Sequence, residues 1–210
     1  MAEMKRLNLR VVNKQSSNLK LISSAIKSIS EKGIKETTMS DVSQGAGLSQ
    51  GIVNFHFKSK ELLLIETLKF ISNEYLQSFQ NCLKKSGSDP CKQIIAIINN
   101  DFSNKICSRD KIALWFTFFS EVKFKPAYHH ICKERDLYYQ KIIEDIFRKL
   151  IKLEKSKISL TNISNGLQAL VMGLWLDQLE DPDTFKRKQA KQICFNYIKS
   201  NFPKQFKNIL

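Results

Sequence analysis

Amide and ammonium side chains with informative spacing lie near the end of the first quarter of the chain. Apolar residues there are spaced to pack inward and leave four residues on the outer side of a short predicted helix: Gln50, Gly51, Asn54 and His56. The amides of Gln50 and Asn54 can pair bidentately with adenine in a major groove. Lys58 and Lys60 follow, with the charge that phosphate contacts need. These residue types favour recognition of double-stranded DNA.

Two short predicted helices, at 39–45 and 50–56, must hold these side chains in place. The turn between them contains Gly45 and Gly47, because a turn this tight needs glycine for positive φ and for close approach of the helices. The residues spaced to pack inward are Val42, Ala46, Leu48, Ile52 and Val53. A short polar helix braced by another helix is the arrangement that a major-groove reader requires.

Hydroxyl residues precede three of the predicted helices. Thr38, Ser49 and Ser59 can each cap a helix, and Asp41 lies three residues after Thr38, as in a capping box. Free N–H groups at such helix starts also favour an anion, so we expect these residues and the neighbouring lysines to contact phosphates. The alternative is that the hydroxyls only cap and that Lys58 is merely solvated.

The charge of the chain is strongly positive, with a formal net charge of +14. Residues 1–60 hold ten Lys and Arg against four Asp and Glu, and are about twice as basic per residue as residues 61–210. This balance indicates an anionic partner, either nucleic acid or a membrane surface. Lys5, Arg6 and Arg10 could form a basic arm. A Lys-rich, AT-biased genome is an alternative source of part of the excess.

Several other function classes find little support in the residues. The chain contains no nucleophile elbow, Walker loop, dinucleotide fingerprint or zincin motif, so we predict that it is not an enzyme and needs no cofactor. His129, His130 and Cys132 lie close together, but no second group of ligands has a matching spacing, and we expect no metal.

Five cysteines without C-x-x-C pairing indicate a reduced, cytoplasmic protein. No apolar run is long enough to span a membrane. A basic helical protein lying on anionic membranes remains a remote alternative.

Helical periodicity and the scarcity of glycine and proline predict an all-α fold of about nine helices. We expect a helix-turn-helix head at 1–60 and a helical-bundle body at 61–210. The predicted helices are 16–32, 39–45, 50–56, 60–84, 90–107, 109–123, 127–155, 160–180 and 184–201.

Apolar faces in the body suggest two roles. Helices 160–180 and 184–201 carry residues that could form a four-helix dimer interface or close the core of one chain: Leu167, Leu170, Val171, Leu174, Ile193 and Tyr197. Aromatic residues elsewhere could form a ligand pocket or fill a core: Trp115, Phe116, Phe118, Phe119, Tyr138, Tyr139 and Trp175. Aromatic boxes bind quaternary ammonium by cation–π attraction.

The segment 37–63 resembles the TetR family of bacterial regulators. The resemblance rests on the turn Ala46-Gly47-Leu48-Ser49 and on the F-x-x-K pattern that begins at Phe57. It implies a homodimer that places helix 49–56 of each head in successive major grooves of a palindromic operator. The DNA-contacting positions that it implies are Thr38, Gln50, Gly51, Asn54, His56 and Lys60. The family usually has Tyr where this chain has Asn54.

The body resembles the BetI branch of the same family, whose repressors respond to choline. The similar segments are 113–142 and 166–198. The resemblance implies a small-molecule inducer such as choline or a related quaternary amine. We expect the aromatic residues of the body to bind it: Trp115, Phe116, Phe119, Tyr138, Tyr139 and Trp175. An unrelated apolar or aromatic ligand is the alternative.

Overall fold

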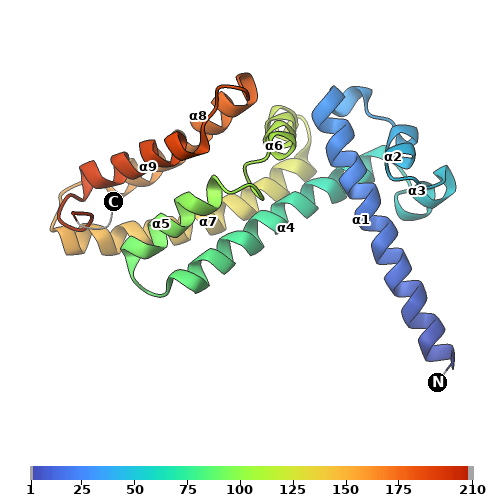
Figure 1. The fold of residues 1–210 in the computed structure, drawn as a ribbon, viewed down its shortest axis with the longest axis horizontal. Coiled ribbons are helices and arrows are strands. Elements are labelled where there is room, and N and C mark those ends of the chain that lie inside the picture. The colour runs from blue at the N-terminus through green and yellow to red at the C-terminus, as the bar shows by residue number, and fades with distance from the viewer. Residues whose placement is uncertain (1, 208–210) are drawn as a thin grey trace. The chain divides into compact units, whose positions relative to one another are not determined.

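The computed structural model describes residues 2–207, with side chains from Val12 onward. These residues form nine helices and no strand, so the predicted all-α fold is confirmed (Figure 1). The helices are α1 (Ala2–Glu36), α2 (Met39–Gly45), α3 (Gln50–His56), α4 (Lys60–Ser86), α5 (Pro90–Asp101), α6 (Arg109–Glu121), α7 (Pro126–Glu154), α8 (Leu160–Glu180) and α9 (Arg187–Asn201).

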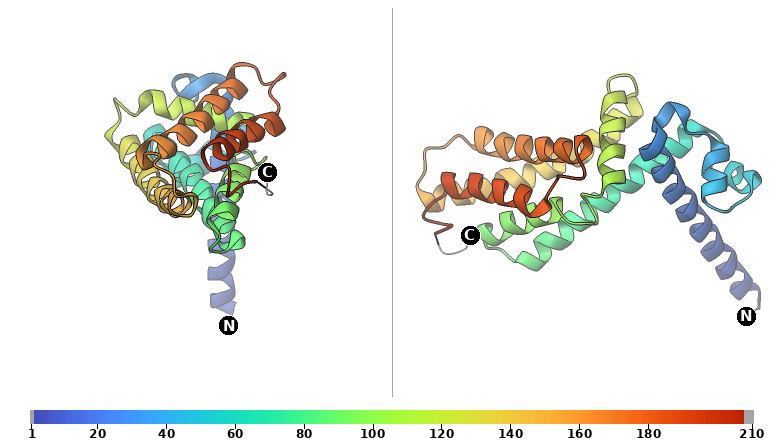
Figure 2. Two further views of the ribbon diagram at one scale, coloured as in Figure 1. Left: turned by 90° about the vertical axis from the view of Figure 1, so that its left-hand side faces the viewer. Right: turned by 45° about the horizontal axis from the view of Figure 1, so that its top comes forward.

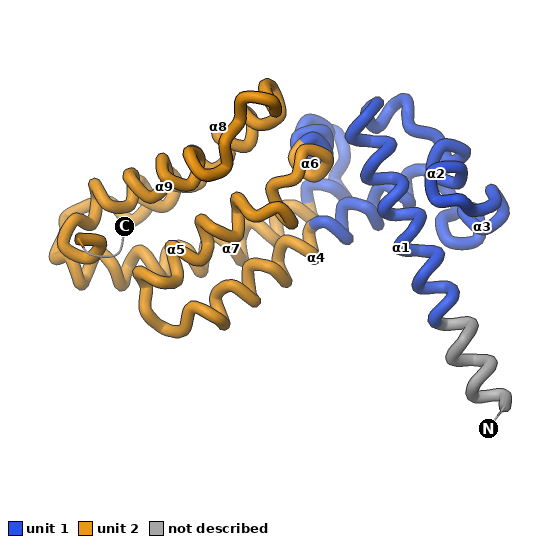
Figure 3. Tube along the Cα trace, viewed as in Figure 1, with its two compact units in different colours: residues 1–71, 113–129 blue, residues 72–112, 130–210 orange. Residues whose placement is uncertain are grey.

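The chain divides into two compact units, coloured separately in Figure 3. The first comprises Met1–Ile71 and Ala113–His129, and the second comprises Ser72–Ile112 and His130–Leu210. Three helices, α4, α6 and α7, therefore contribute residues to both units.

In the first unit, α1 packs against α2 and α3. Helix α1 buries Ile22, Ala25 and Ile29, which share one face, and Val42 of α2 and Val53 of α3 are fully buried as well. Burial of such side chains contributes about 1.5–3 kcal/mol each. These contacts hold two helices that are too short to be stable alone.

Helix α1 begins earlier than predicted, at Ala2 rather than near residue 16. The Ser17 hydroxyl donates to the carbonyl of Asn13 at 3.0 Å, so Ser17 lies within the helix rather than capping it. Helical geometry is interrupted at Gly33, where φ is 79°, close to the predicted end. The proposed basic arm of Lys5, Arg6 and Arg10 lies outside the described side chains.

In the second unit, α8 and α9 run antiparallel side by side, and α5 packs against α9 (Figures 1 and 2). The core of this unit is apolar and largely inaccessible to water. Its fully buried members include Ile94, Ile97, Ile98, Phe147, Ile163, Cys194, Ile198 and Phe202.

Two predicted boundaries in the second unit were wrong for local reasons. Helix α5 ends at Asp101 instead of residue 107, because the Ser103 side chain accepts from the Ile106 amide at 3.3 Å and competes with the helix. Helix α9 begins at Arg187 instead of residue 184, because both the amide and the hydroxyl of Thr184 donate to the carboxylate of Asp181. The Arg187 guanidinium donates to the Cys107 carbonyl at 2.7 Å and ties α9 to the segment after α5.

None of the described helices combines the length and the apolar character needed to cross a membrane. All five cysteines are free thiols, four of them buried. Within residues 2–207 no group of three His, Cys, Asp or Glu residues could hold a metal ion.

Candidate nucleic-acid interface

The turn between α2 and α3 uses its two glycines in different ways. Gly47 has a φ of +64°, a conformation that other residues adopt only with strain. Gly45 lies so close to α1 that a Cβ there would collide with the Ser24 hydroxyl. The predicted need for positive φ and for close approach is therefore confirmed, at one glycine each.

The start of α2 carries the predicted capping box. The Asp41 amide donates to the Thr38 hydroxyl at 3.1 Å, and the Thr38 amide donates to the Asp41 carboxylate at 2.7 Å. Lys32 of α1 lies 2.7 Å from the same carboxylate. The hydrogen bonds from Lys32 and Thr38 lower the pKa of Asp41 to about 2. Asp41 is therefore ionised at neutral pH and anchors α2 to α1.

Helix α3 has one buried side and one exposed side. Val53 is fully inaccessible, and Phe57 directly after the helix is buried as well. Gln50, Gly51 and Asn54 are exposed, as their spacing predicted. The Gln50 amide nitrogen donates to the Asn54 carbonyl oxygen at 3.5 Å, and its oxygen accepts from Ser43 at 3.2 Å. The two amides that we expect to read bases are thus held together on the exposed side.

His56 is placed differently from the other three residues of the outer set. Its Nε2 lies 2.7 Å from the Ser17 hydroxyl of α1, and the side chain is half-buried. Burial, helped by the nearby Lys14 charge, lowers the pKa of His56. The imidazole is therefore neutral at pH 7 and braces α3 against α1.

The flanks of α3 supply hydroxyl and ammonium groups. Ser49 occupies the N-cap position, but its hydroxyl makes no capping hydrogen bond, contrary to prediction. Ser59 does cap α4, since its hydroxyl accepts from the Leu62 amide at 3.2 Å. Lys58 is exposed, and the Lys60 ammonium donates to the Lys35 carbonyl at 2.8 Å. Lys60 thus links the start of α4 to the end of α1.

Phe55 is an exposed residue of α3 that the sequence reasoning did not single out. Its side chain is 69% exposed, and the Lys14 ammonium lies 5.4 Å from the ring centroid. Lys14 also lines a groove of about 650 Å³ with Gln15, Asn18, Leu19 and His56. Its place directly after Asn54, among the polar residues of the outer set, was the available signal.

The aromatic residues predicted to bind a ligand fall into both units. Trp115, Phe116 and Phe119 lie in the first unit, where the Trp115 and Phe119 rings stack at 5.8 Å. The second unit contains Tyr138, Tyr139 and Trp175. Tyr138 is 38% exposed, whereas Tyr139 and Trp175 are buried.

A carboxyl group that the sequence reasoning missed lies among the aromatic residues of the second unit. Asp101 accepts hydrogen bonds from the Tyr75 hydroxyl at 2.9 Å and from the Tyr139 hydroxyl at 3.4 Å. The Trp175 indole donates to the Asp101 backbone carbonyl at 3.2 Å. Burial raises the pKa of Asp101 to about 7, although the tyrosine hydrogen bonds act in the opposite direction. Its place on the same helical face as Ile94, Ile97 and Ile98, seven residues after the first of them, was the available signal.

Two family models match the chain. The one described as "Bacterial regulatory proteins, tetR family" matches residues 21–67, which contain α2 and α3. The one described as "BetI-type transcriptional repressor, C-terminal" matches residues 91–203, more than half of the chain. The chain belongs to the TetR family and is of the BetI type. It is therefore a transcriptional regulator, and DNA binding and a response to small ligands are typical of this family.

Relatives across the whole length agree with this assignment. The HTH-type transcriptional regulator BetI of Proteus mirabilis (strain HI4320) is 26% identical over 199 residues, which are 93% of this chain and 94% of that protein. A transcriptional regulator of Pseudomonas aeruginosa PAO1 has a TM-score of 0.76 at 18% identity, with 92% of this chain and 93% of that chain covered. A regulator of Saccharomonospora viridis, solved in complex with choline, has a TM-score of 0.75 at 16% identity, with 89% and 97% covered. At such identities the solved structures support the fold.

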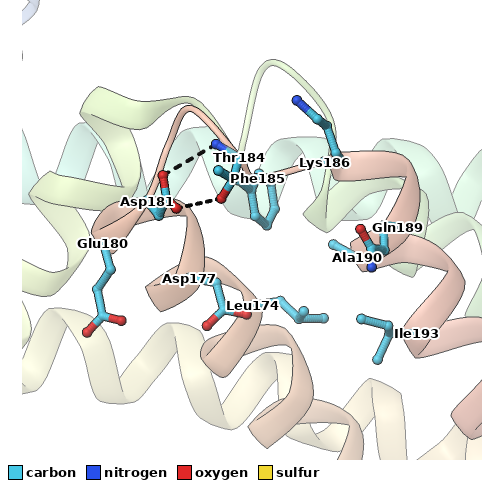
Figure 4. A pocket seen from close by; sticks show the side chains of 10 residues that line it. All are labelled: Leu174, Asp177, Glu180, Asp181, Thr184, Phe185, Lys186, Gln189, Ala190 and Ile193. Atoms are coloured by element: carbon cyan, nitrogen blue, oxygen red, sulfur yellow. Dashed lines mark hydrogen bonds between the residues drawn. The ribbon is translucent and has the colours of Figure 1, made fainter.

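Helices α8 and α9 of this TetR-family chain enclose a groove of about 340 Å³ (Figure 4). Its lining combines carboxylates of α8, such as Asp177 and Glu180, with apolar side chains such as Ile193 of α9. Of the residues predicted for a dimer interface, Leu167, Val171 and Leu174 are buried within one chain. Exposed apolar residues on these helices are Leu176 and Ile193, each 39% accessible.

Proposed function

We propose that the protein is a homodimeric repressor that binds a palindromic operator and is released from it by a small cationic inducer. The observation that carries the DNA part is the exposed side of α3. Gln50 and Asn54 lie there side by side, while the buried side chains of Val53 and Phe57 hold the opposite side of the helix in the core. Rigid support of this kind lets a short helix hold its amides against base edges.

The proposed phosphate contacts flank α3. Lys58 is exposed, and the Ser49 hydroxyl has no capping role, so both can turn to a phosphate. Thr38 and Lys60 lie at the starts of α2 and α4, where backbone N–H groups favour an anion. Gly51 allows close approach of the backbone to the DNA, and His56 completes the proposed set as a bracing residue. On this reading residues 1–60 form the DNA-binding domain, and the protein works in the cytoplasm with the chromosome.

The proposed dimer forms through α8 and α9, within the ligand-binding and dimerisation domain at 61–210. Leu176 and Ile193 are apolar and exposed there. Gly173 of α8 faces open space, since no atom lies within 4 Å of the position that a Cβ would take. An open glycine next to exposed aliphatic side chains allows a second helix to approach closely. Two heads joined in this way multiply the affinity of one head for its half-site.

The proposed inducer is choline or a related quaternary amine. The BetI-type match of the C-terminal region and the choline bound by the Saccharomonospora viridis regulator support this ligand class. The aromatic residues Tyr138, Tyr139 and Trp175 of the second unit offer the ring faces that attract such cations, whereas Trp115, Phe116 and Phe119 belong to the first unit. An apolar or aromatic ligand is the alternative occupant of the same residues.

A mobility-shift titration tests the proposed function. The DNA is the promoter region of the protein's own gene, compared with the same fragment mutated in one half-site and with a random duplex of equal length. We expect tight binding of the intact fragment, a loss of at least tenfold with the mutated half-site, and release on addition of choline. Equal affinity for all three fragments would contradict the proposal.

A further inference from the structure

Asp101 is the most deeply buried carboxyl group among the acidic side chains of the second unit. It lies in the last turn of α5 and is 1% exposed. Its two carboxyl oxygens accept from tyrosines on two other helices, Tyr75 of α4 and Tyr139 of α7. The hydrogen bonds to its carboxyl group come from neutral side chains, those of Tyr75, Tyr139 and Asn100. Ionising a buried carboxyl group under these conditions costs several kcal/mol.

The two tyrosines that bind this carboxyl group pack in an aromatic cluster formed by α4 and α7. The ring centroids of Phe79 and Tyr139 are 5.1 Å apart, and those of Tyr75 and Tyr139 are 6.2 Å apart. Phe79 is fully inaccessible to water. Ring faces carry negative potential, so a carboxylate and three rings together present a strongly cation-attracting environment.

The other titratable and charged groups near Asp101 come from each neighbouring element. Arg135 of α7 lies with its guanidinium 6.0 Å from the Tyr75 ring centroid and forms an ion pair with Asp136. The thiols of Cys82, Cys107 and Cys194 also interact electrostatically with Asp101, and burial raises the pKa of each of them to about 11 or 12. These thiols stay neutral at physiological pH, so Asp101 is the group of this cluster that titrates near neutrality.

We propose that Asp101 is the buried counter-charge of an organic-cation site whose walls are Tyr75, Phe79 and Tyr139. This inference rests on the proposed function, because it identifies the group that would recognise the charge of the inducer. It replaces a purely aromatic cage, built from Tyr138, Tyr139 and Trp175, with an aromatic site that contains a carboxylate. The class of ligand is a monovalent alkylammonium ion with an apolar surface.

Access of a cation requires that the rings separate. Phe79 belongs to α4 and Tyr139 to α7, and their rings are in contact. A cation held between them and Asp101 must therefore change the packing of α4 against α7 within the second unit. Differential binding to a rearranged state is what an inducer needs in order to shift a conformational equilibrium.

Proton release is the measurable consequence of this site. The raised pKa of Asp101, about 7, means that the carboxyl group is largely protonated below neutrality when no cation is bound. A bound cation stabilises the carboxylate, so the proton leaves to solvent as the cation binds. Affinity should therefore rise with pH until Asp101 is ionised without ligand, by about 20-fold between pH 5.5 and 7.5. Above about pH 8 it should stay constant.

Isothermal titration of the full-length protein tests the proposal. The probes are choline, tetramethylammonium and 3,3-dimethyl-1-butanol, a neutral analogue of choline with the same shape. The variants are Asp101→Asn and, as a matched control, Asp145→Asn, which removes an exposed carboxylate of α7 paired with Arg148. Titrations in two buffers with different ionisation enthalpies give the number of protons released.

We expect the wild type and Asp145→Asn to bind both cations at least tenfold more tightly than the alcohol, with proton release at pH 6.5. Asp101→Asn should bind the cations at least tenfold more weakly, without proton release. Phe79→Leu, which keeps the carboxyl group and removes one ring, should lower the preference for cations over the alcohol and serves if Asp101→Asn fails to fold.

Three results would overturn the proposal: equal binding of cation and alcohol, unchanged cation binding by Asp101→Asn, or no binding of either cation to the wild type. These titrations contain no DNA, so their failure is distinguishable from failure of the proposed function. If the proposed function also holds, Asp101→Asn still binds promoter DNA but no longer releases it when choline is added.

Discussion

At the scale of single residues, Asp101 should make the stability of the protein depend on pH. Burial raises its folded-state pKa from 3.8 to about 7, so the folded state holds a proton that the unfolded state releases. Stability from this group is therefore greatest at low pH and is lost as the pH rises from about 4 to 7. Between pH 5 and pH 7.5 the free energy of unfolding of the wild type should fall by about 2–3 kcal/mol more than that of Asp101→Asn.

Urea denaturation of both proteins at the two pH values measures this difference. The variant Asp145→Asn provides the baseline, because its carboxylate is exposed. A constant difference between wild type and Asp101→Asn across this pH range would show that Asp101 does not titrate there.

Substitutions on and beside α3 should separate base reading from phosphate binding. Gln50→Ala should weaken binding to the operator by about 1–3 kcal/mol while leaving binding to random DNA almost unchanged. Lys58→Ala should weaken both by a similar factor and should make the salt dependence shallower by about one ion. Fluorescence anisotropy on labelled operator and random duplexes at several salt concentrations measures both effects. Equal losses on both duplexes for Gln50→Ala would contradict its role as a base reader.

Local patterns predicted some of these residues and missed others. The capping box of Thr38 and Asp41 and the exposed side of α3 follow from residues close in sequence, so they could be predicted. The missing hydroxyl cap at Ser49 depends on one rotamer, which spacing does not determine. Asp101 was missed because its partners Tyr75 and Tyr139 are distant in sequence and meet it only through packing.

At the scale of elements, the two glycines Gly47 and Gly51 should respond oppositely to alanine. Gly47→Ala places a Cβ at a φ of +64° and should destabilise the fold by about 1–2 kcal/mol. Gly51 lies within α3, where a Cβ would meet only the Ser49 hydroxyl at 3.8 Å, so Gly51→Ala should stabilise the fold by about 0.5–1 kcal/mol.

Thermal melting and DNA binding together distinguish two roles of Gly51. If its backbone approaches the DNA, Gly51→Ala will melt at a higher temperature than the wild type and yet bind the operator more weakly. An unchanged operator affinity would remove Gly51 from the proposed contact set.

Element boundaries were predictable where a cap or breaker acts within a few residues. The bounds of α2, α3 and α8 agree with the predicted ranges because Thr38, Gly45 and Ser159 give local signals. The boundaries of α5 and α9 differ because the side chains of Ser103 and Asp181 accept hydrogen bonds from backbone amides that a helix would otherwise use. Hydrophobic periodicity contains no information about such hydrogen bonds.

At the scale of the whole molecule, the proposed dimer depends on exposed residues of α8 and α9. Ile193→Glu places a charge on this surface and should shift the protein from dimer to monomer at micromolar concentration. Leu137→Glu is the matched control, since Leu137 is 56% exposed on α7. Size-exclusion chromatography with light scattering measures the mass of each variant. A dimeric Ile193→Glu protein would place the interface elsewhere.

The fold class was predictable from sequence because helical periodicity and a compact glycine turn are local features. The division of the aromatic residues between two units could not be predicted from the sequence. Trp115 and Tyr139 both lie on helices among other aromatic residues, but they belong to different units. Ligand recognition depends on such long-range packing, which explains why Asp101 and its partner Tyr75 were absent from the predicted ligand-binding residues.

Selection of bound duplexes from a random-sequence DNA pool tests the central claim most directly. We expect enrichment of an inverted repeat bound by two chains. Enrichment should be lost for Gln50→Ala, and choline should release the bound DNA. Enrichment of a single asymmetric site, or no sequence preference at all, would contradict a dimeric operator-binding repressor.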